Sequence, residues 1–208
     1  MFNLNDNLKN KKFLIYGYGK SGSSAHNYLK KYNKILIYDD NKKPSKFFTS
    51  LKKIKITKFD YIVLSPGIDI NHCKLKNYLK RNRSKIITDL DIFYLNNQKN
   101  LKISITGTNG KSTTAKLLFE ILKDQKKDVI LAGNIGIPIL SQRKIKPTTV
   151  FVIEVSSYQL EYSKYFKTDY AFILNISPDH LERHKSIQRY TQAKFKLILN
   201  QRKNYYAF

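Results

Sequence analysis

Short apolar runs alternate with longer amphipathic segments in the first part of the chain. Residues 12–16 (KFLIY) form an apolar, β-prone run that ends in a glycine, and residues 23–32 follow with apolar side chains at helical spacing. Two more buried-type strands are expected at 34–38 and 61–64. Strands that alternate with helices in this way predict a parallel sheet with helices on its faces.

The same alternation restarts after the polar stretch 96–100. Strands are expected at 101–105, 129–132, 149–154 and 171–175. The helix expected at 112–122 carries Leu117, Leu118, Ile121 and Leu122 on one face. The prediction is therefore an α/β protein with two parallel sheets, divided into domains at 1–97 and 98–208. Ligands of such sheets bind at the carboxyl ends of the strands.

Composition narrows the class of protein. The hydrophobic fraction is 41%, and no apolar run approaches the roughly 18 residues that a membrane-spanning helix needs. The polar N-terminus lacks the apolar core of a secretory signal, and the single cysteine, Cys73, cannot form an internal disulfide. We expect a cytoplasmic protein with no membrane partner.

The net charge of +24 is the extreme value, and a field of this size attracts polyanions. The basic residues are mostly lysines spread over the whole chain, and they accompany many Asn, Ile and Tyr residues, which share A/T-rich codons. Specific nucleic-acid readers cluster their charge and favour arginine at base edges. Base-composition bias is thus the preferred explanation, nucleic acid is not an expected partner, and a polyanion-binding module remains an alternative.

A phosphate-binding loop is the sharpest signal. It lies between a buried strand and a helix and consists of Gly107, Thr108, Asn109, Gly110, Lys111, Ser112 and Thr113. Glycines let backbone N–H groups approach phosphate oxygens, the lysine reaches the terminal phosphates, and the Ser112 hydroxyl can ligate Mg²⁺. The general pattern requires a glycine where this chain has Ile105, so the loop is a shortened variant. ATP and Mg²⁺ are the expected cofactors.

A second glycine loop, residues 17–22 (GYGKSG), follows the first predicted strand. Asp39 comes 17 residues after Gly22, at the place where the dinucleotide fingerprint puts an acid for a ribose hydroxyl. Taken alone, this loop indicates NAD. A nicotinamide-dependent oxidoreductase is therefore a second alternative, although it leaves the first loop unexplained.

The shortened loop GTNGKST resembles the signature of the Mur ligases and their folylpolyglutamate synthetase relatives. Three further stretches agree with it. Residues 133–136 (GNIG) resemble the family's substrate loop, residues 154–161 (EVSSYQLE) its metal-binding strand end, and residues 175–184 (NISPDHLERH) its histidine motif. The resemblance extends from Phe13 to about Leu199, and these motifs are most similar to those of the members that add D-glutamate.

The resemblance implies an ATP-dependent ligase that adds D-glutamate to UDP-N-acetylmuramoyl-L-alanine through an acyl phosphate, in peptidoglycan synthesis. It implies a Rossmann-like first domain followed by a P-loop-type central domain. Members of the family continue beyond residue 208 into a third domain, so the chain alone is expected not to turn over, and the complete protein is expected to be a monomer. Another member of the family is a third alternative.

The resemblance also assigns catalytic and metal-binding roles. Lys111 neutralises the transferring phosphoryl group, and Ser112 and Glu154 hold one Mg²⁺. His180 is carried over as a ligand of a second metal ion. Lys194 stands where the family has a carbamylated lysine, a modification that turns a cation into an oxygen-bearing anion able to ligate or orient that metal.

For the substrate, the resemblance implies that the first glycine loop holds UDP instead of NAD. Ser21 and Gly22 face the diphosphate, and Asp39 and Asp40 lie at the uridine. The remaining positions carried over as substrate-binding are Ser65, Pro66, Gly67, Asn134, Ser156 and Gln159. Asp40-Asn41 departs from the Thr-Arg of some members, which puts the details of uridine recognition in question.

Overall fold

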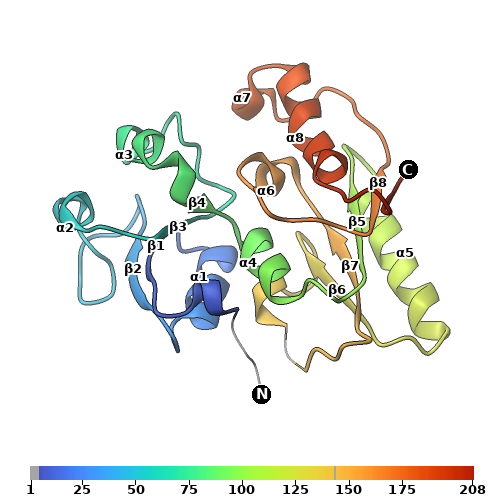
Figure 1. The fold of residues 1–208 in the computed structure, drawn as a ribbon. Helices are drawn as coiled ribbons and strands as arrows, with labels where there is room; N and C mark the ends of the chain where they lie inside the picture. The colour runs from blue at the N-terminus through green and yellow to red at the C-terminus, as the bar shows by residue number, and fades with distance from the viewer. Residues whose placement is uncertain (1–4, 143) are drawn as a thin grey trace.

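The computed structural model describes residues 5–142 and 144–208. It contains two parallel β-sheets that lie side by side, with a short helix, α4, between them (Figure 1). Helices lie on both faces of each sheet. The α/β class with parallel sheets is confirmed.

The first sheet has the strand order β2-β1-β3-β4, with every pairing parallel. Its strands are short and almost wholly apolar, as expected for a sheet that is buried on both faces. The elements of this half are η1 (Asp6–Leu8), β1 (Lys12–Tyr16), α1 (Lys20–Leu29), β2 (Lys34–Tyr38), α2 (Leu51–Ile56), β3 (Tyr61–Leu64), α3 (Lys76–Arg81), η2 (Arg83–Lys85), β4 (Ile86–Ile87) and α4 (Asp89–Asn96).

Alternate side chains of the strands point to opposite faces of this sheet. Phe13 and Ile15 of β1 pack with α1 and α4 on the face that looks toward the second sheet. Leu14 and Tyr16 pack with α2 and α3 on the outer face. The two apolar clusters hold the carboxyl ends of the strands, and therefore the first glycine loop, in a fixed place.

The second sheet has the order β6-β7-β5-β8-β9 and is also parallel throughout. The strand that carries the phosphate loop, β5, lies at its centre. The elements are β5 (Lys102–Thr106), α5 (Lys111–Asp124), β6 (Val129–Gly133), η3 (Ile139–Ser141), β7 (Val150–Glu154), α6 (Ser157–Glu161), β8 (Tyr170–Ile173), α7 (Leu181–His184), α8 (Ile187–Leu199) and β9 (Tyr206–Ala207).

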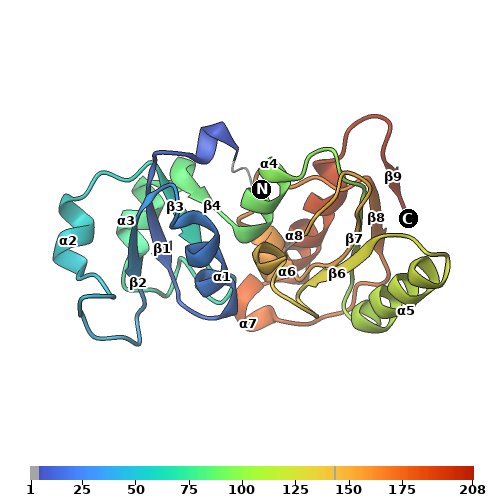
Figure 2. The ribbon, with the colours of Figure 1, turned by 90° about the horizontal axis from the view of Figure 1, so that it is seen from below.

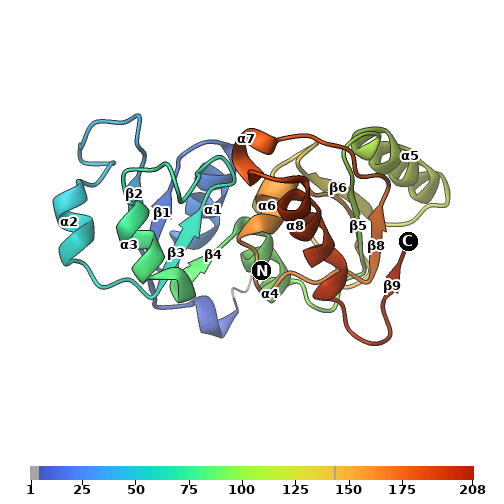
Figure 3. The same ribbon diagram turned by 90° about the horizontal axis from the view of Figure 1, so that it is seen from above.

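One apolar cluster joins the two halves. It contains Phe93 of α4 and Phe151 of β7, whose rings meet edge to face with centroids 4.8 Å apart. Helices α6 and α8 add Leu160 and Leu197 to the same cluster, whereas α5 covers the opposite face of the second sheet. Figures 2 and 3 show α7 at the boundary between the halves, close to the first one.

The predicted strands are confirmed to within one or two residues, but helix α1 differs more from the prediction. Helix α1 begins three residues earlier than expected, directly at the glycine loop. In α5, Leu118 and Leu122 pack on the sheet, but Leu117 and Ile121 are 61% and 45% exposed. The four side chains share one side of the helix, but only part of that side is buried, because a single sheet face covers only part of the helix circumference.

Among the residues that the structure describes, no helix is both long and apolar enough to span a bilayer.

Candidate functional site

Four loops meet at the carboxyl edge of the second sheet. They follow β5, β6, β7 and β8, which are neighbours in the order β6-β7-β5-β8. Because parallel strands end at the same edge, residues far apart in sequence come together there. The predicted phosphate loop, Asn134, Glu154 and the histidine motif all begin at this edge.

The phosphate loop has a backbone that depends on its glycines. Gly107 and Gly110 have φ angles of 155° and 79°, which other residues rarely adopt, and Gly110 forms the N-cap of α5. The loop is held from β8 by Asn175, whose Oδ1 accepts hydrogen bonds from the backbone N–H groups of Thr108 (3.1 Å) and Asn109 (2.9 Å). The free N-terminus of α5 is thereby presented at the edge of the sheet, a ready site for phosphate.

Asn175 and Tyr190 are residues to which the sequence analysis gave no role. The Tyr190 hydroxyl lies 3.1 Å from Thr108 Oγ1, so α8 contacts the loop directly. Asn175 belongs to the histidine motif, and an amide shortly after a buried strand was the available signal for it.

Glu154 is 1% exposed at the end of β7, and its two oxygens have separate partners. Oε2 accepts from Ser112 Oγ at 2.7 Å, and Oε1 accepts from Asn134 Nδ2 at 2.8 Å. Asn134 reaches it because Gly133 lies against β7, where a Cβ would come within 2.2 Å of the Glu154 carbonyl oxygen. A hydroxyl, a carboxylate and an amide NH₂ group therefore meet at one point next to the phosphate loop.

Lys194, on α8, lies against the start of the loop and is 1% exposed. Its Nζ donates to the Gly107 carbonyl oxygen at 2.7 Å and lies 4.5 Å from the centre of the Tyr190 ring. Burial, followed by repulsion from Lys111, lowers the pKa of Lys194 to about 8. Lys111 itself donates to the Thr108 carbonyl oxygen at 2.7 Å.

His180 stands at the start of α7 with a positive φ of 54° and a side chain 44% exposed. Its ring packs on Tyr158 at 4.8 Å and lies 6.3 Å from Tyr190. The second histidine of the motif, His184, is buried and its Nε2 lies 3.0 Å from Ser157 Oγ. Burial lowers the pKa of His184, as suits a structural imidazole.

Ser156 and Gln159, predicted to bind substrate, are bonded to each other in this structure. Ser156 Oγ accepts from the Gln159 backbone N–H at 3.2 Å, and Gln159 Oε1 accepts from the Ser156 N–H at 3.0 Å. This reciprocal pair is the capping box of α6. Their predicted contact with substrate stays a prediction.

The first glycine loop occupies the carboxyl edge of the other sheet. Gly22 packs so closely on it that a Cβ would lie 1.9 Å from the Gly17 carbonyl oxygen. Ser65 donates its hydroxyl to the same oxygen at 2.8 Å, so the segment after β3 closes over the loop. Pro66 and Gly67 form the turn that follows. Ser21 is the second residue of α1. It hydrogen-bonds the buried Asp89, whose pKa is raised by burial.

The two acids after β2 point in different directions. Asp39 accepts from the backbone N–H groups of Tyr18 (2.8 Å) and Asn41 (2.9 Å), which places it beside the glycine loop. Asp40 instead accepts from the Tyr16 hydroxyl at 2.7 Å and lies toward the outer core. The geometry thus brings Asp39, but not Asp40, to the loop.

In residues 5–142 and 144–208, no group of three or more His, Cys, Asp and Glu side chains is arranged to hold a metal ion. The oxygen atoms of Ser112 and Glu154 offer a different donor set. It suits Mg²⁺, which prefers hard oxygen ligands, keeps several waters and takes only one or two carboxylates from the protein.

The second half of the chain matches a family model. The Mur ligase middle domain matches residues 105–208. The chain is also similar to curated UDP-N-acetylmuramoylalanine–D-glutamate ligases. It is 35% identical over 209 residues to that of Caldicellulosiruptor bescii, covering 93% of this chain and 46% of the relative. It is 38% identical over 209 residues to that of Rickettsia prowazekii, covering 96% and 46%. The chain thus spans less than half the length of these relatives.

Solved structures share the fold. UDP-N-acetylmuramate:L-alanyl-gamma-D-glutamyl-meso-diaminopimelate ligase from Neisseria meningitides aligns with a TM-score of 0.60 at 14% identity, covering 95% of this chain and 70% of that one. UDP-N-acetylmuramate-alanine ligase from Thermotoga maritima gives 0.51 at 23% identity, covering 95% and 49%. At these identities, the likeness supports the arrangement of the sheets.

Proposed function

The chain belongs to the Mur ligase family, and on that premise we propose that the protein uses ATP to join D-glutamate to UDP-N-acetylmuramoyl-L-alanine in peptidoglycan synthesis. The choice of D-glutamate is supported by curated relatives that are named as D-glutamate ligases. The proposed reaction activates the substrate carboxylate as an acyl phosphate, which the amino group of D-glutamate then attacks.

The single observation that carries the proposal is the triangle of Ser112, Glu154 and Asn134 at the start of α5. It joins a phosphate loop to a buried carboxylate through bonds of 2.7 and 2.8 Å. These residues fit MgATP, because backbone N–H groups at a helix N-terminus suit phosphate and the oxygen donors suit magnesium. When bound, ATP supplies the phosphoryl group that activates the carboxylate.

The proposed reaction brings together two negatively charged groups, and residues of this chain are proposed to offset their repulsion. A carboxylate and a triphosphate repel each other, and bringing them together requires fixed positive charge in a site shielded from water. Lys111 is the proposed source of that charge at the phosphates. His180 and a carbamylated Lys194 are proposed to hold a second metal ion, which would supply positive charge near the substrate carboxylate.

We assign substrate recognition to the first sheet. Ser21 and Gly22 lie where a diphosphate would meet the N-terminus of α1, and Asp39 lies beside them with its carboxylate next to the loop. Residues 1–97 and 98–208 are the proposed functional units, one for the UDP-linked substrate and one for ATP. NAD binding to the first loop is the competing proposal, but it does not explain the phosphate loop of the second sheet.

The test uses the whole enzyme, assayed for ADP release with ATP, UDP-N-acetylmuramoyl-L-alanine and D-glutamate. Lys111→Ala should lower kcat at least about 100-fold, the usual scale for loss of one group that stabilises transition-state charge. Lys123→Ala, at an exposed position near the end of α5, is the matched control and should retain activity. ADP release that does not depend on D-glutamate, or binding of NAD in place of the UDP compound, would contradict the proposal.

A further inference from the structure

One arginine joins the two halves of the molecule at the segment that closes over the first glycine loop. Arg183 lies in α7, three residues after His180, and its side chain is only 8% exposed. Its Nη2 donates to the carbonyl oxygen of Ile68 at 2.7 Å, across a sequence separation of 115 residues. Its Nε donates to Glu161 Oε2 at 2.9 Å. The guanidinium therefore bonds the first half and the second half at once.

Aromatic rings hold the guanidinium in this position. Its carbon lies 5.2 Å from the centre of the Tyr158 ring and 5.7 Å from that of Tyr162, both within the range of cation–π attraction. Tyr162 also packs on the outer core of the first half. A planar group with a paired carboxylate and two neighbouring rings keeps a single orientation, which a flexible ammonium could not match.

On the first half, the bond ends at the segment that closes over the first glycine loop. Ile68 directly follows the turn at Pro66 and Gly67, and its side chain packs against Gly17, where a Cβ would lie 3.2 Å from Ile68 Cγ1. Ser65, at the other end of the turn, holds the Gly17 carbonyl oxygen. Movement of Ile68 would therefore move the closing segment of the proposed UDP site.

On the second half, the bond begins at a helix fixed to the phosphate-loop side. The Tyr158 hydroxyl donates to Glu182 at 3.0 Å, and His184 contacts Ser157, so α7 is attached to α6. Helix α6 in turn starts three residues after Glu154. Arg183 thus connects the segment 65–68 to the elements that carry Glu154 and His180.

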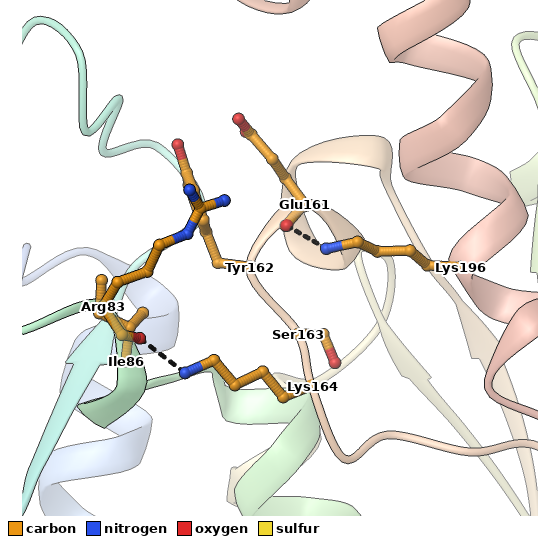
Figure 4. Close-up of a pocket in the computed structure, with 7 residues that line it drawn as sticks. All are labelled: Arg83, Ile86, Glu161, Tyr162, Ser163, Lys164 and Lys196. Atoms are coloured by element: carbon orange, nitrogen blue, oxygen red, sulfur yellow. Dashed lines mark hydrogen bonds between the residues drawn. The ribbon is translucent and has the colours of Figure 1, made fainter. Parts of the chain in front are cut away.

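The neighbouring contacts show that this side of the junction is well fixed. A cleft of about 70 Å³ lies between the halves, lined by residues 161–164, Arg83, Ile86 and Lys196 (Figure 4). Lys164 crosses it and donates to the Arg83 and Ser84 carbonyl oxygens at 2.6 and 2.9 Å. Lys196 donates to the Glu161 carbonyl oxygen, which holds the partner of Arg183 in place.

We propose that Arg183 is a positioning residue, which fixes the closing segment 65–68 of the first site against the histidine motif of the second. In this role it contacts neither substrate nor ATP. It fixes the position of the first site relative to the second, so that the proposed substrate carboxylate reaches the phosphates. The inference rests on the proposed function. Misplacement of reacting groups by about 1 Å costs on the order of 100-fold in rate, which sets the expected effect.

The first measurement needs no ligand. Hydrogen–deuterium exchange of the full chain should show at least about tenfold faster exchange at residues 67–70 in Arg183→Lys than in the wild type, with β5 and α5 unchanged. Arg189→Lys, at an exposed position on α8, is the matched control. Glu161→Gln leaves the bond to Ile68 but removes the charge that orients the guanidinium, so its effect should be intermediate. Unchanged exchange at 67–70 in Arg183→Lys would overturn the proposal.

The second measurement separates positioning from mere support. In the whole enzyme, Arg183→Lys should lower kcat by about 100-fold and leave the KM values for ATP and the UDP substrate within about twofold, because each half-site is intact. An active wild type with normal kcat in Arg183→Lys would overturn this proposal alone. An inactive wild type would instead contradict the proposed function, and the exchange result would then decide whether Arg183 holds the segment.

Discussion

Single glycines set the shape of both loops, but for different reasons. At Gly107 and Gly110 the backbone itself requires positive φ angles. At Gly22, inside α1, the requirement is space, since a Cβ would lie 1.9 Å from the Gly17 carbonyl oxygen. Backbone atoms cannot move aside as a flexible side chain can, so the helix and the loop must separate if a methyl group is added.

Gly22→Ala should therefore destabilise the chain by about 1–3 kcal/mol, the usual cost of overpacking, and abolish uridine diphosphate binding to the first loop. Gly19→Ala is the matched control, because nothing lies within 4 Å of a Cβ there. Urea unfolding and calorimetric titration provide the two measurements. Equal stability of the two variants would show that the loop moves to accommodate the added methyl group at little cost.

Lys194 should form a carbamate in the presence of bicarbonate. Only the neutral amine attacks CO₂, with loss of a proton, and a pKa lowered to about 8 means that the neutral fraction rises steeply between pH 7 and pH 9. With ¹³C-bicarbonate, NMR should show a carbamate signal that grows over this interval. The signal should be absent from Lys194→Arg and present in Lys123→Arg. Its absence from the wild type at pH 8 would leave Lys194 as an amine that bonds Gly107.

At the scale of elements, a buried carboxylate of α4 makes the polar contacts between this helix and the segment after α6. Asp91 is fully buried, and its Oδ1 accepts from Ser163 Oγ (2.7 Å) and from the backbone N–H groups of residues 164–166 (2.7–3.0 Å). Its Oδ2 accepts from the Thr88 N–H at 2.9 Å. Asp91, in the helix between the two sheets, thus fixes the conformation of the segment after α6.

Asp91→Ala should cost ~3 kcal/mol or more, because it leaves several buried donors without an acceptor. Ser163→Ala removes only one of these donors and should cost about 1 kcal/mol. Comparing their unfolding free energies in urea tests the difference. Costs of equal size would mean that the segment finds other acceptors once Asp91 is gone.

The sequence predicted the strands and the phosphate loop because both depend on local patterns, namely apolar runs and a glycine-rich turn. It missed β4, two residues long, since Ile86-Ile87 is too short to show a period. The long-range hydrogen bonds of Asn175, Tyr190 and Arg183 were not predicted for another reason. Their bonds join residues 66 to 115 apart, and no pattern within one segment reports which distant segment will lie beside it.

For the whole molecule, the net charge of +24 predicts weak, salt-sensitive binding of any polyanion. A 20-nucleotide single-stranded DNA should bind at about 50 mM salt and lose at least tenfold in affinity by about 200 mM, whereas uridine diphosphate binding should change much less. Fluorescence anisotropy measures both. DNA affinity that persists at high salt would indicate a dedicated nucleic-acid site.

The strand order of the second sheet also governs when the phosphate loop can become rigid during synthesis. Asn175 bonds Thr108 and Asn109 from 67 and 66 residues further along the chain. At elongation rates of about 5–20 residues per second, the loop leaves the ribosome roughly 3 to 13 seconds before the residue that holds it. Non-local pairing of this kind is slow to form. A nascent chain therefore carries the phosphate loop without the side chain that holds it for that interval, and the proposed ATP site is complete only after Asn175 has emerged.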